Sequence, residues 1–211
     1  MSDGRPCRRK SPRTAMPESA WPREKAPGLD DLHFIRQTIE RSASFTAVPG
    51  WGFCVMGLTA LIAAPIAFRQ RTAEGWLAAW LLEALLASTI ALVAMHHKAT
   101  RLRTHVLSVS GRRLFVGLLP ALAAGGLLTV SLMWEGPARL IPGVWLVLYG
   151  VAVMQAGTFS VRVVPVMGAA FVAFGAVALP MPWRPANVLL ALGFGLLHIG
   201  FGAFIARKHG G

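Results

Sequence analysis

The chain has 211 residues, of which 55% are hydrophobic and only 14% are charged, and its mean hydropathy is +0.55. A soluble domain carries about 25% charged residues, so this composition argues against a water-soluble globular protein, and the length excludes a large multidomain enzyme. The formal net charge is nevertheless +12. We therefore expect one membrane domain with a short basic tail.

Residues 1–29 form the basic tail and contain five of the fourteen prolines, a composition that predicts disorder. No apolar stretch follows Arg8 and Arg9, and the first apolar run begins near Val48, too late for a secretory signal. Met16 is an alternative start. Because the tail lacks interleaved aromatic residues, its charge does not favour nucleic-acid binding.

Residues 30–47 predict a short amphipathic helix before the first crossing. Leu32, Ile35 and Ile39 share one helical face at i, i+3 and i+7 spacing, and Asp30 can cap the start of the helix. This helix is expected either to lie on the inner membrane surface or to pack as a surface helix on the bundle.

Six apolar runs follow, each close to the roughly 20 residues with which an α-helix crosses about 30 Å of hydrocarbon. Helices are expected because backbone polar groups cannot face lipid unpaired. The fourth and fifth runs are short and close together, so they form either a tight helical hairpin or one re-entrant element. Within a membrane domain of residues 48–211, the predicted crossings are 48–68, 76–96, 114–134, 141–158, 163–180 and 187–206.

The basic residues predict the orientation of this all-α, polytopic domain. With both termini in the cytoplasm, seventeen of the 21 Lys and Arg residues lie on the inner side. Trp76, Trp134, Trp145 and Trp183 then lie near the outer interface and predict an aromatic belt. Anionic lipids of the inner leaflet attract basic residues near the surface. The residues expected to contact their headgroups are Lys98, Arg101, Arg103, Arg112 and Arg113.

Two of the predicted crossings open with a similar motif. The pattern S-x-x-x-V-P-x-x-G fits residues 44–52 and again residues 160–168. Proline suits a first helical turn, and a serine just before it can cap that turn. The pattern indicates either an internal duplication, as in many transporters, or convergent helix-start chemistry. Its fixed residues are Ser44, Pro49, Gly52, Ser160, Pro165 and Gly168.

Polar residues inside the crossings are the candidate site, and they are Glu83, Gln155, Arg162 and His198. Glu83 is the only acid well inside a predicted crossing, and His198 is the only histidine in mid-helix. An intramembrane carboxyl group usually faces the bundle interior. The four residues form either a proton or ligand site or a set of interhelical hydrogen bonds, worth on the order of 0.6 kcal/mol each.

Glycines spaced seven residues apart predict close helix packing in the last crossing. The pairs are Gly193 with Gly200 and Gly195 with Gly202. Small residues at this spacing let a neighbouring helix approach closely.

The sequence predicts no catalytic residue, metal site or cofactor. It contains no CxxC, Cys/His cluster, HExxH, GxSxG or glycine-rich phosphate loop. His96 and His198 are the only pair suited to a b-type haem, and their predicted depths differ by roughly 14 Å at the helical rise. This difference argues against haem.

The chain resembles a family of six-helix bacterial inner-membrane proteins to which no activity is assigned. The resemblance is carried by residues 44–52, 160–168 and 197–202, and it spans about residues 32–211. The resemblance implies a bacterial inner-membrane location. We expect a binding, sensory or accessory module within a larger or homo-oligomeric assembly. The alternatives are a small secondary or proton-coupled transporter that uses Glu83 and His198, and a membrane redox or enzyme subunit.

Overall fold

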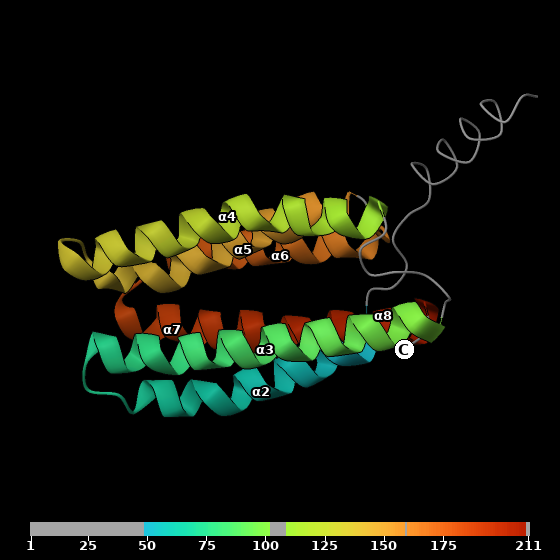
Figure 1. Cartoon of the computed structure of the whole chain (residues 1–211). Helices are drawn as coiled ribbons and strands as arrows, with labels where there is room; N and C mark the ends of the chain where they lie inside the picture. Colours follow the sequence, from blue (N-terminus) through green and yellow to red (C-terminus); the bar gives the residue numbers. More distant parts are fainter. Residues whose placement is uncertain (1–48, 102–108, 159, 210–211) are drawn as a thin grey trace, which may run out of the picture. The chain divides into compact units, whose positions relative to one another are not determined.

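The computed structural model describes residues 49–101, 109–158 and 160–209, and nearly all of these are helical (Figure 1). Several predictions concern residues outside these ranges: the basic tail, the amphipathic helix, Ser44 and Arg103. The side chain of Arg113 also lies outside the described part of the chain. The helices are α2 (Gly50–Phe68), α3 (Ala73–Arg101), α4 (Val109–Trp134), the 3₁₀ turn η2 (Ala138–Leu140), α5 (Ile141–Gly157), α6 (Val163–Ala178), α7 (Trp183–Leu192), the π-helical turn η3 (Gly193–Leu197) and α8 (His198–His209).

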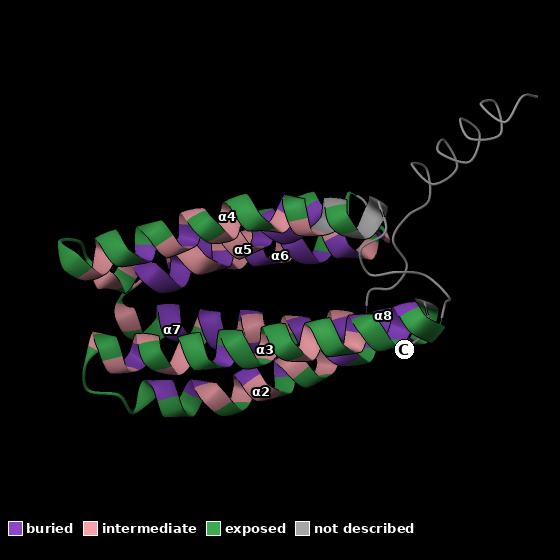
Figure 2. Cartoon of the chain, in the orientation of Figure 1, coloured by how far each residue is buried: buried purple, intermediate pink, exposed green. Residues whose placement is uncertain are grey.

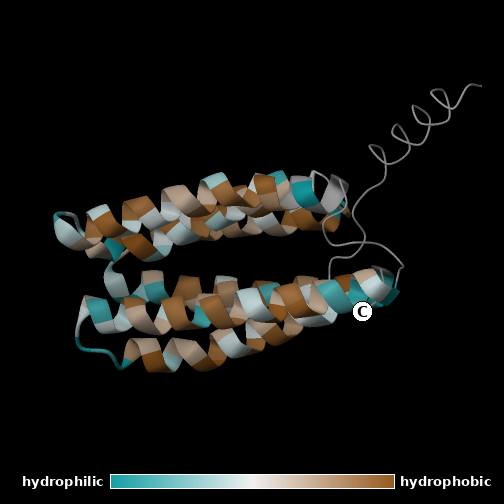
Figure 3. Ribbon diagram, in the orientation of Figure 1, coloured by the Kyte–Doolittle hydropathy of each residue, from teal (hydrophilic) through white to brown (hydrophobic). Residues whose placement is uncertain are grey.

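Within the described ranges, five helical segments are long and apolar enough to cross a membrane, and α6, with 16 residues, is apolar but shorter. Each segment is predominantly hydrophobic along its length (Figure 3). The α-helical prediction is therefore confirmed, and the fold is that of a multi-pass membrane protein. The fourth and fifth apolar runs form a hairpin of two separate helices, α5 and α6, which pack directly against each other.

Glycines allow α5 and α6 to approach each other at backbone distance. A Cβ atom added to Gly150 would lie 2.7 Å from the carbonyl oxygen of Gly168, and one added to Gly168 would lie 2.6 Å from that of Gly150. Gly143, Gly157 and Gly175 extend this seam, since a Cβ on any of them would meet a residue of the partner helix within 3.0 Å. Two glycine-lined faces thus hold this pair together by close packing.

A second glycine seam joins α2 to the last helix. A Cβ on Gly57 would lie 2.5 Å from the carbonyl oxygen of Gly195, and one on Gly202 would lie 2.7 Å from that of Gly50. The predicted Gly195–Gly202 seam is therefore present. The other predicted pair does not form a seam, because Gly193 faces the α5–α6 hairpin whereas a Cβ on Gly200 would meet open space.

The helices form two groups of three, α4 with α5 and α6, and α2 with α3 and the continuous α7–η3–α8 helix (Figure 1). The groups meet where α5 and α6 contact α7 and η3. Burial is concentrated at this junction, and α3 is largely exposed (Figure 2). Core residues at the junction include Ile141, Leu146, Phe171, Ala186 and Leu190.

Candidate functional site

The most enclosed polar side chain of the candidate set is that of His198, which is only 1% exposed at the start of α8. Its Nε2 lies 2.8 Å from the hydroxyl oxygen of Tyr149 on α5. Three further rings surround the imidazole, with centroid distances of 5.6 Å to Phe53, 5.3 Å to Phe171 and 6.0 Å to Phe194. Residues from α2, α5, α6 and η3 therefore converge on one imidazole where the two helix groups meet.

The direction of the hydrogen bond between His198 and Tyr149 depends on which ring nitrogen carries the proton. The backbone carbonyls of Gly193 and Phe194 lie beside the ring, but within the described structure Nδ1 forms no hydrogen bond of ordinary geometry. With the proton on Nδ1, beside these carbonyls, the Tyr149 hydroxyl donates to Nε2; with the proton on Nε2, the ring donates to the hydroxyl oxygen. The π-helical turn η3 directly before His198 supplies these carbonyls, and such turns are frequent at functional sites.

Glu83 occupies a separate place in the bundle, on the side of α3 that faces α2. It is 7% exposed, and the Thr59 hydroxyl donates a hydrogen bond of 2.8 Å to its Oε1. The same hydroxyl lies 2.9 Å from the carbonyl oxygen of Met56. The single Thr59 hydroxyl proton is thus shared between the Glu83 carboxyl group and the Met56 carbonyl. Glu83 and His198 have different hydrogen-bond partners, on different helices.

The other two candidate residues are exposed. Gln155 lies near the end of α5, with its Cγ 3.5 Å from the position of a Cβ on Gly117 of α4. Arg162, and not Ser160, occupies the N-cap position of α6. The Arg162 side chain forms no capping hydrogen bond. The structure therefore does not bring the four candidates into one hydrogen-bonded network.

The repeated motif occupies comparable positions in the two helices that it opens. Pro49 is the N-cap residue of α2, and Pro165 lies in the first turn of α6. Both motif glycines meet a neighbouring helix: a Cβ on Gly52 would lie 2.7 Å from the Cβ of Ala94, whereas Gly168 faces Gly150. In both copies the proline marks a helix start and the glycine a helix contact.

The basic residues after the second crossing differ in exposure. Arg101 and Arg112 are exposed, as expected of residues that contact headgroups. Lys98, also on α3, is buried. The headgroup contact expected of these basic residues stays a prediction.

The tryptophans of the predicted aromatic belt differ in exposure and in their neighbours. Trp134 is 83% exposed at the end of α4. Trp76 is buried and packs on Trp183 with ring centroids 4.8 Å apart. Trp145 is half-buried and donates a 2.9 Å hydrogen bond to the hydroxyl of Thr129. Trp76 and Trp183 thus connect α3 with α7, and Trp145 and Thr129 connect α5 with α4.

Sequence reasoning missed Tyr149 and Thr59, the hydrogen-bond partners of His198 and Glu83. Tyr149 is the only tyrosine of the chain and lies inside an apolar run, a signal that was available in the sequence. Among residues 49–101, 109–158 and 160–209, no group of three or more His, Cys, Asp or Glu residues could hold a metal ion. No family model, curated protein or solved structure matches the chain.

Proposed function

We propose that the chain is a six-span protein of the bacterial inner membrane, with both termini in the cytoplasm, that acts as a binding or accessory module within a larger or homo-oligomeric assembly. The sixth span is α6, whose 16 residues cover about 24 Å at the helical rise. A short span of this kind is accommodated by local bilayer thinning. The excess of Lys and Arg on one side supports the orientation, and the family resemblance supports the location.

The observation that carries this proposal is the weak packing of α3. Only 6% of its most apolar window is buried, and Leu82 and Leu85 are 69% and 67% exposed. Helices in lipid associate through close packing and interhelical hydrogen bonds rather than through the hydrophobic effect. A helix that uses so little of its surface within the bundle retains a long face for a further helix.

A transporter is the second candidate, favoured by the setting of His198. This residue lies where the two helix groups meet, directly after a π-helical turn whose Gly193 and Phe194 carbonyls lie beside its ring. Movement of one helix group against the other is the usual way in which a transporter exposes a central site. On this hypothesis Glu83→Gln and His198→Ala abolish pH-dependent transport in proteoliposomes while the protein still folds.

The accessory-module proposal is tested by photo-crosslinking in native membranes. A crosslinking amino acid at Leu82 or Leu85 on α3 is expected to give one discrete protein adduct, and native gels should show a particle larger than one 22.6 kDa chain. Leu127 on α4, which is 74% exposed, is the matched lipid-facing control and should give no such adduct. A single-chain particle, with only lipid adducts at all three positions, would contradict the proposal.

A further inference from the structure

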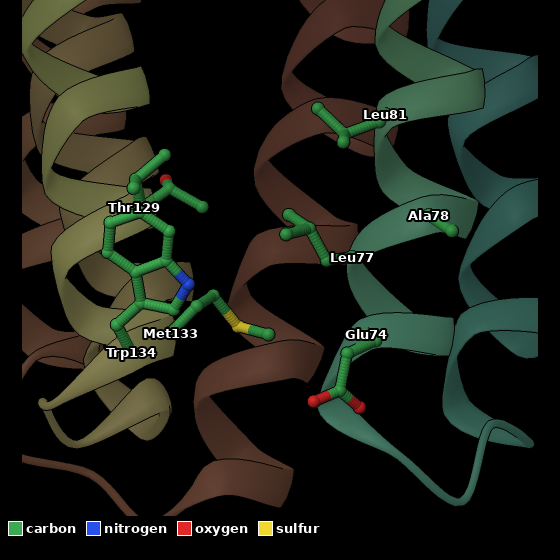
Figure 4. Close-up of a pocket in the computed structure, with 8 residues that line it drawn as sticks. Glu74, Leu77, Ala78, Leu81, Thr129, Met133 and Trp134 are labelled. Atoms are coloured by element: carbon green, nitrogen blue, oxygen red, sulfur yellow. The ribbon is translucent and has the colours of Figure 1, made fainter.

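A groove of about 300 Å³ lies between α3 and α4, and it is lined mainly by apolar side chains such as Leu77, Leu81 and Met133 (Figure 4). Thr129 also lines the groove, but its hydroxyl is already hydrogen-bonded. Within the described residues, none of the lining side chains carries a buried polar atom without a partner. The buried polar groups that need a partner lie on a different face of α3.

Three buried polar groups without a hydrogen-bond partner in the described part of the chain lie near the end of the bundle at which α3 and α7 begin. They are the indole N–H groups of Trp76 and Trp80 on α3 and the side-chain oxygen of Asn187 on α7. Trp76 and Asn187 are only 3% and 1% exposed. The amide nitrogen of Asn187 donates to the Trp183 carbonyl at 2.8 Å, which identifies the other end of the amide as the oxygen. Buried groups of this kind are normally paired, often with ordered water.

The three groups lie at one level of two helices that run in the same direction (Figure 1). Trp76 of α3 packs on Trp183 of α7, with ring centroids 4.8 Å apart. Trp80 and Asn187 each lie four residues beyond this contact, about 6 Å further along their helices at the helical rise. The two indole N–H groups and the Asn187 oxygen are therefore within about one helical turn of each other along the bundle.

We propose that Trp76, Trp80 and Asn187 bind a water molecule, and that this site is the entrance through which water reaches His198. A buried water typically forms about three hydrogen bonds with groups that lack other partners. The two indole N–H groups match its two acceptor positions, and the Asn187 oxygen accepts one of its protons. This set favours water over an ion, because the Asn187 oxygen repels an anion and the two N–H donors repel a cation.

Phe194 separates this site from His198. Its ring centroid lies 6.3 Å from that of Trp80, and the ring stacks on the imidazole at 6.0 Å with an interplanar angle of 16°. Phe194 belongs to the π-helical turn η3, four residues before His198. On the other side of His198, the packed cluster that includes Val153 and Ile205 is apolar. Polar partners for water therefore lead toward His198 from the end of the bundle at which α3 and α7 begin.

This inference deepens the transporter hypothesis. It rests on that hypothesis for the role of His198, and on the proposed topology for assigning this end of the bundle to the outer face. The binding of water depends on neither, because it follows from the unpaired groups. Dry indoles in a protein that transports would overturn only the water site, whereas bound water in a protein that does not transport would overturn only the transporter.

The test measures contacts between water and side chains by NMR cross-relaxation, with the full-length protein in detergent micelles and isotope-labelled tryptophan. We expect long-lived water at the indole protons of both Trp76 and Trp80, whose signals are assigned by replacing each residue with phenylalanine. Asn187→Leu should remove both contacts, because it replaces the acceptor with an apolar side chain. Gln155→Leu is the matched control, since Gln155 is an exposed amide on α5, and it should preserve both. Dry indoles in the wild-type protein, or unchanged contacts in folded Asn187→Leu, would overturn the proposal.

A second pair of variants tests the barrier. With isotope-labelled histidine, water should be absent from the ring of His198 in the wild-type protein and present in Phe194→Ala. Phe194→Leu keeps most of the apolar bulk and should leave the ring dry. The His198 signal is identified as the one that His198→Gln removes. A ring that stays dry in folded Phe194→Ala, or that is hydrated to the same extent in all three proteins, would overturn the entrance and its barrier.

Discussion

Replacement of Gly168 by alanine is expected to weaken the α5–α6 pair. The new Cβ would lie 2.6 Å from the carbonyl oxygen of Gly150 and 2.6 Å from the backbone nitrogen and Cγ of Met154, where side-chain Cβ atoms essentially never approach within 3.0 Å. The helices must therefore separate along their seam. Overpacking of this kind costs about 1–3 kcal/mol, whereas alanine gains up to about 1 kcal/mol over glycine in helix propensity. The steric cost exceeds the gain.

The control for this prediction is Gly126→Ala on α4, where a Cβ would meet no atom within 4 Å. Both variants gain helix propensity and only Gly168→Ala has the clash, so the two should differ by the steric cost alone, about 1–3 kcal/mol. Unfolding in mixed micelles of increasing dodecyl sulfate content, followed by far-UV circular dichroism, measures this difference. Equal midpoints for Gly168→Ala and Gly126→Ala would refute the close α5–α6 seam.

Three further predictions concern the polar groups and the topology. Tyr149→Phe leaves Nε2 of His198 without its hydroxyl partner and should destabilise the bundle by about 1 kcal/mol in the same unfolding assay. Glu83→Gln should cost less than Glu83→Leu, because an amide can still bond the hydroxyl of Thr59; equal losses would contradict a hydrogen-bonding role. With Cys7 and Cys54 removed, a cysteine at Glu135 should react with an impermeant maleimide on intact cells and one at Lys208 should not; the opposite labelling pattern would reverse the proposed orientation.

The helices could be predicted from the sequence because a hydrocarbon environment leaves an apolar run few alternatives to the α-helix. The predicted run 48–68 matches α2, which ends at Phe68. The second helix is less well predicted, since α3 runs from Ala73 to Arg101 rather than from 76 to 96. The two ends of α3 contain charged residues, Glu74 in the first turn and Lys98 and Arg101 in the last. These residues can continue a helix, but a hydropathy window excludes them from the apolar run.

The direction of individual side chains could not be predicted in the same way. Trp76 and Lys98 were expected at the two membrane surfaces, because tryptophan and lysine prefer interfaces. Both are buried, whereas most leucines of α3 are exposed. Residue type indicates where along the membrane normal a side chain is favoured, whereas the rotation of the helix about its axis depends on which neighbours it packs against.

The Tyr149–His198 pair shows why the site required the structure. His198 stands out in the sequence as a polar residue within an apolar run, but its partner lies 49 positions earlier. The two meet because the glycine seams fix both helices: Gly150, next to Tyr149, faces α6, whereas Gly195 and Gly202, on either side of His198, face α2. With these glycines turned toward α6 and α2, Tyr149 and His198 face each other across the junction of the two helix groups. The glycines thus set the helix rotations that form the polar pair, and a change in either seam is expected to disturb the Tyr149–His198 hydrogen bond without altering either residue.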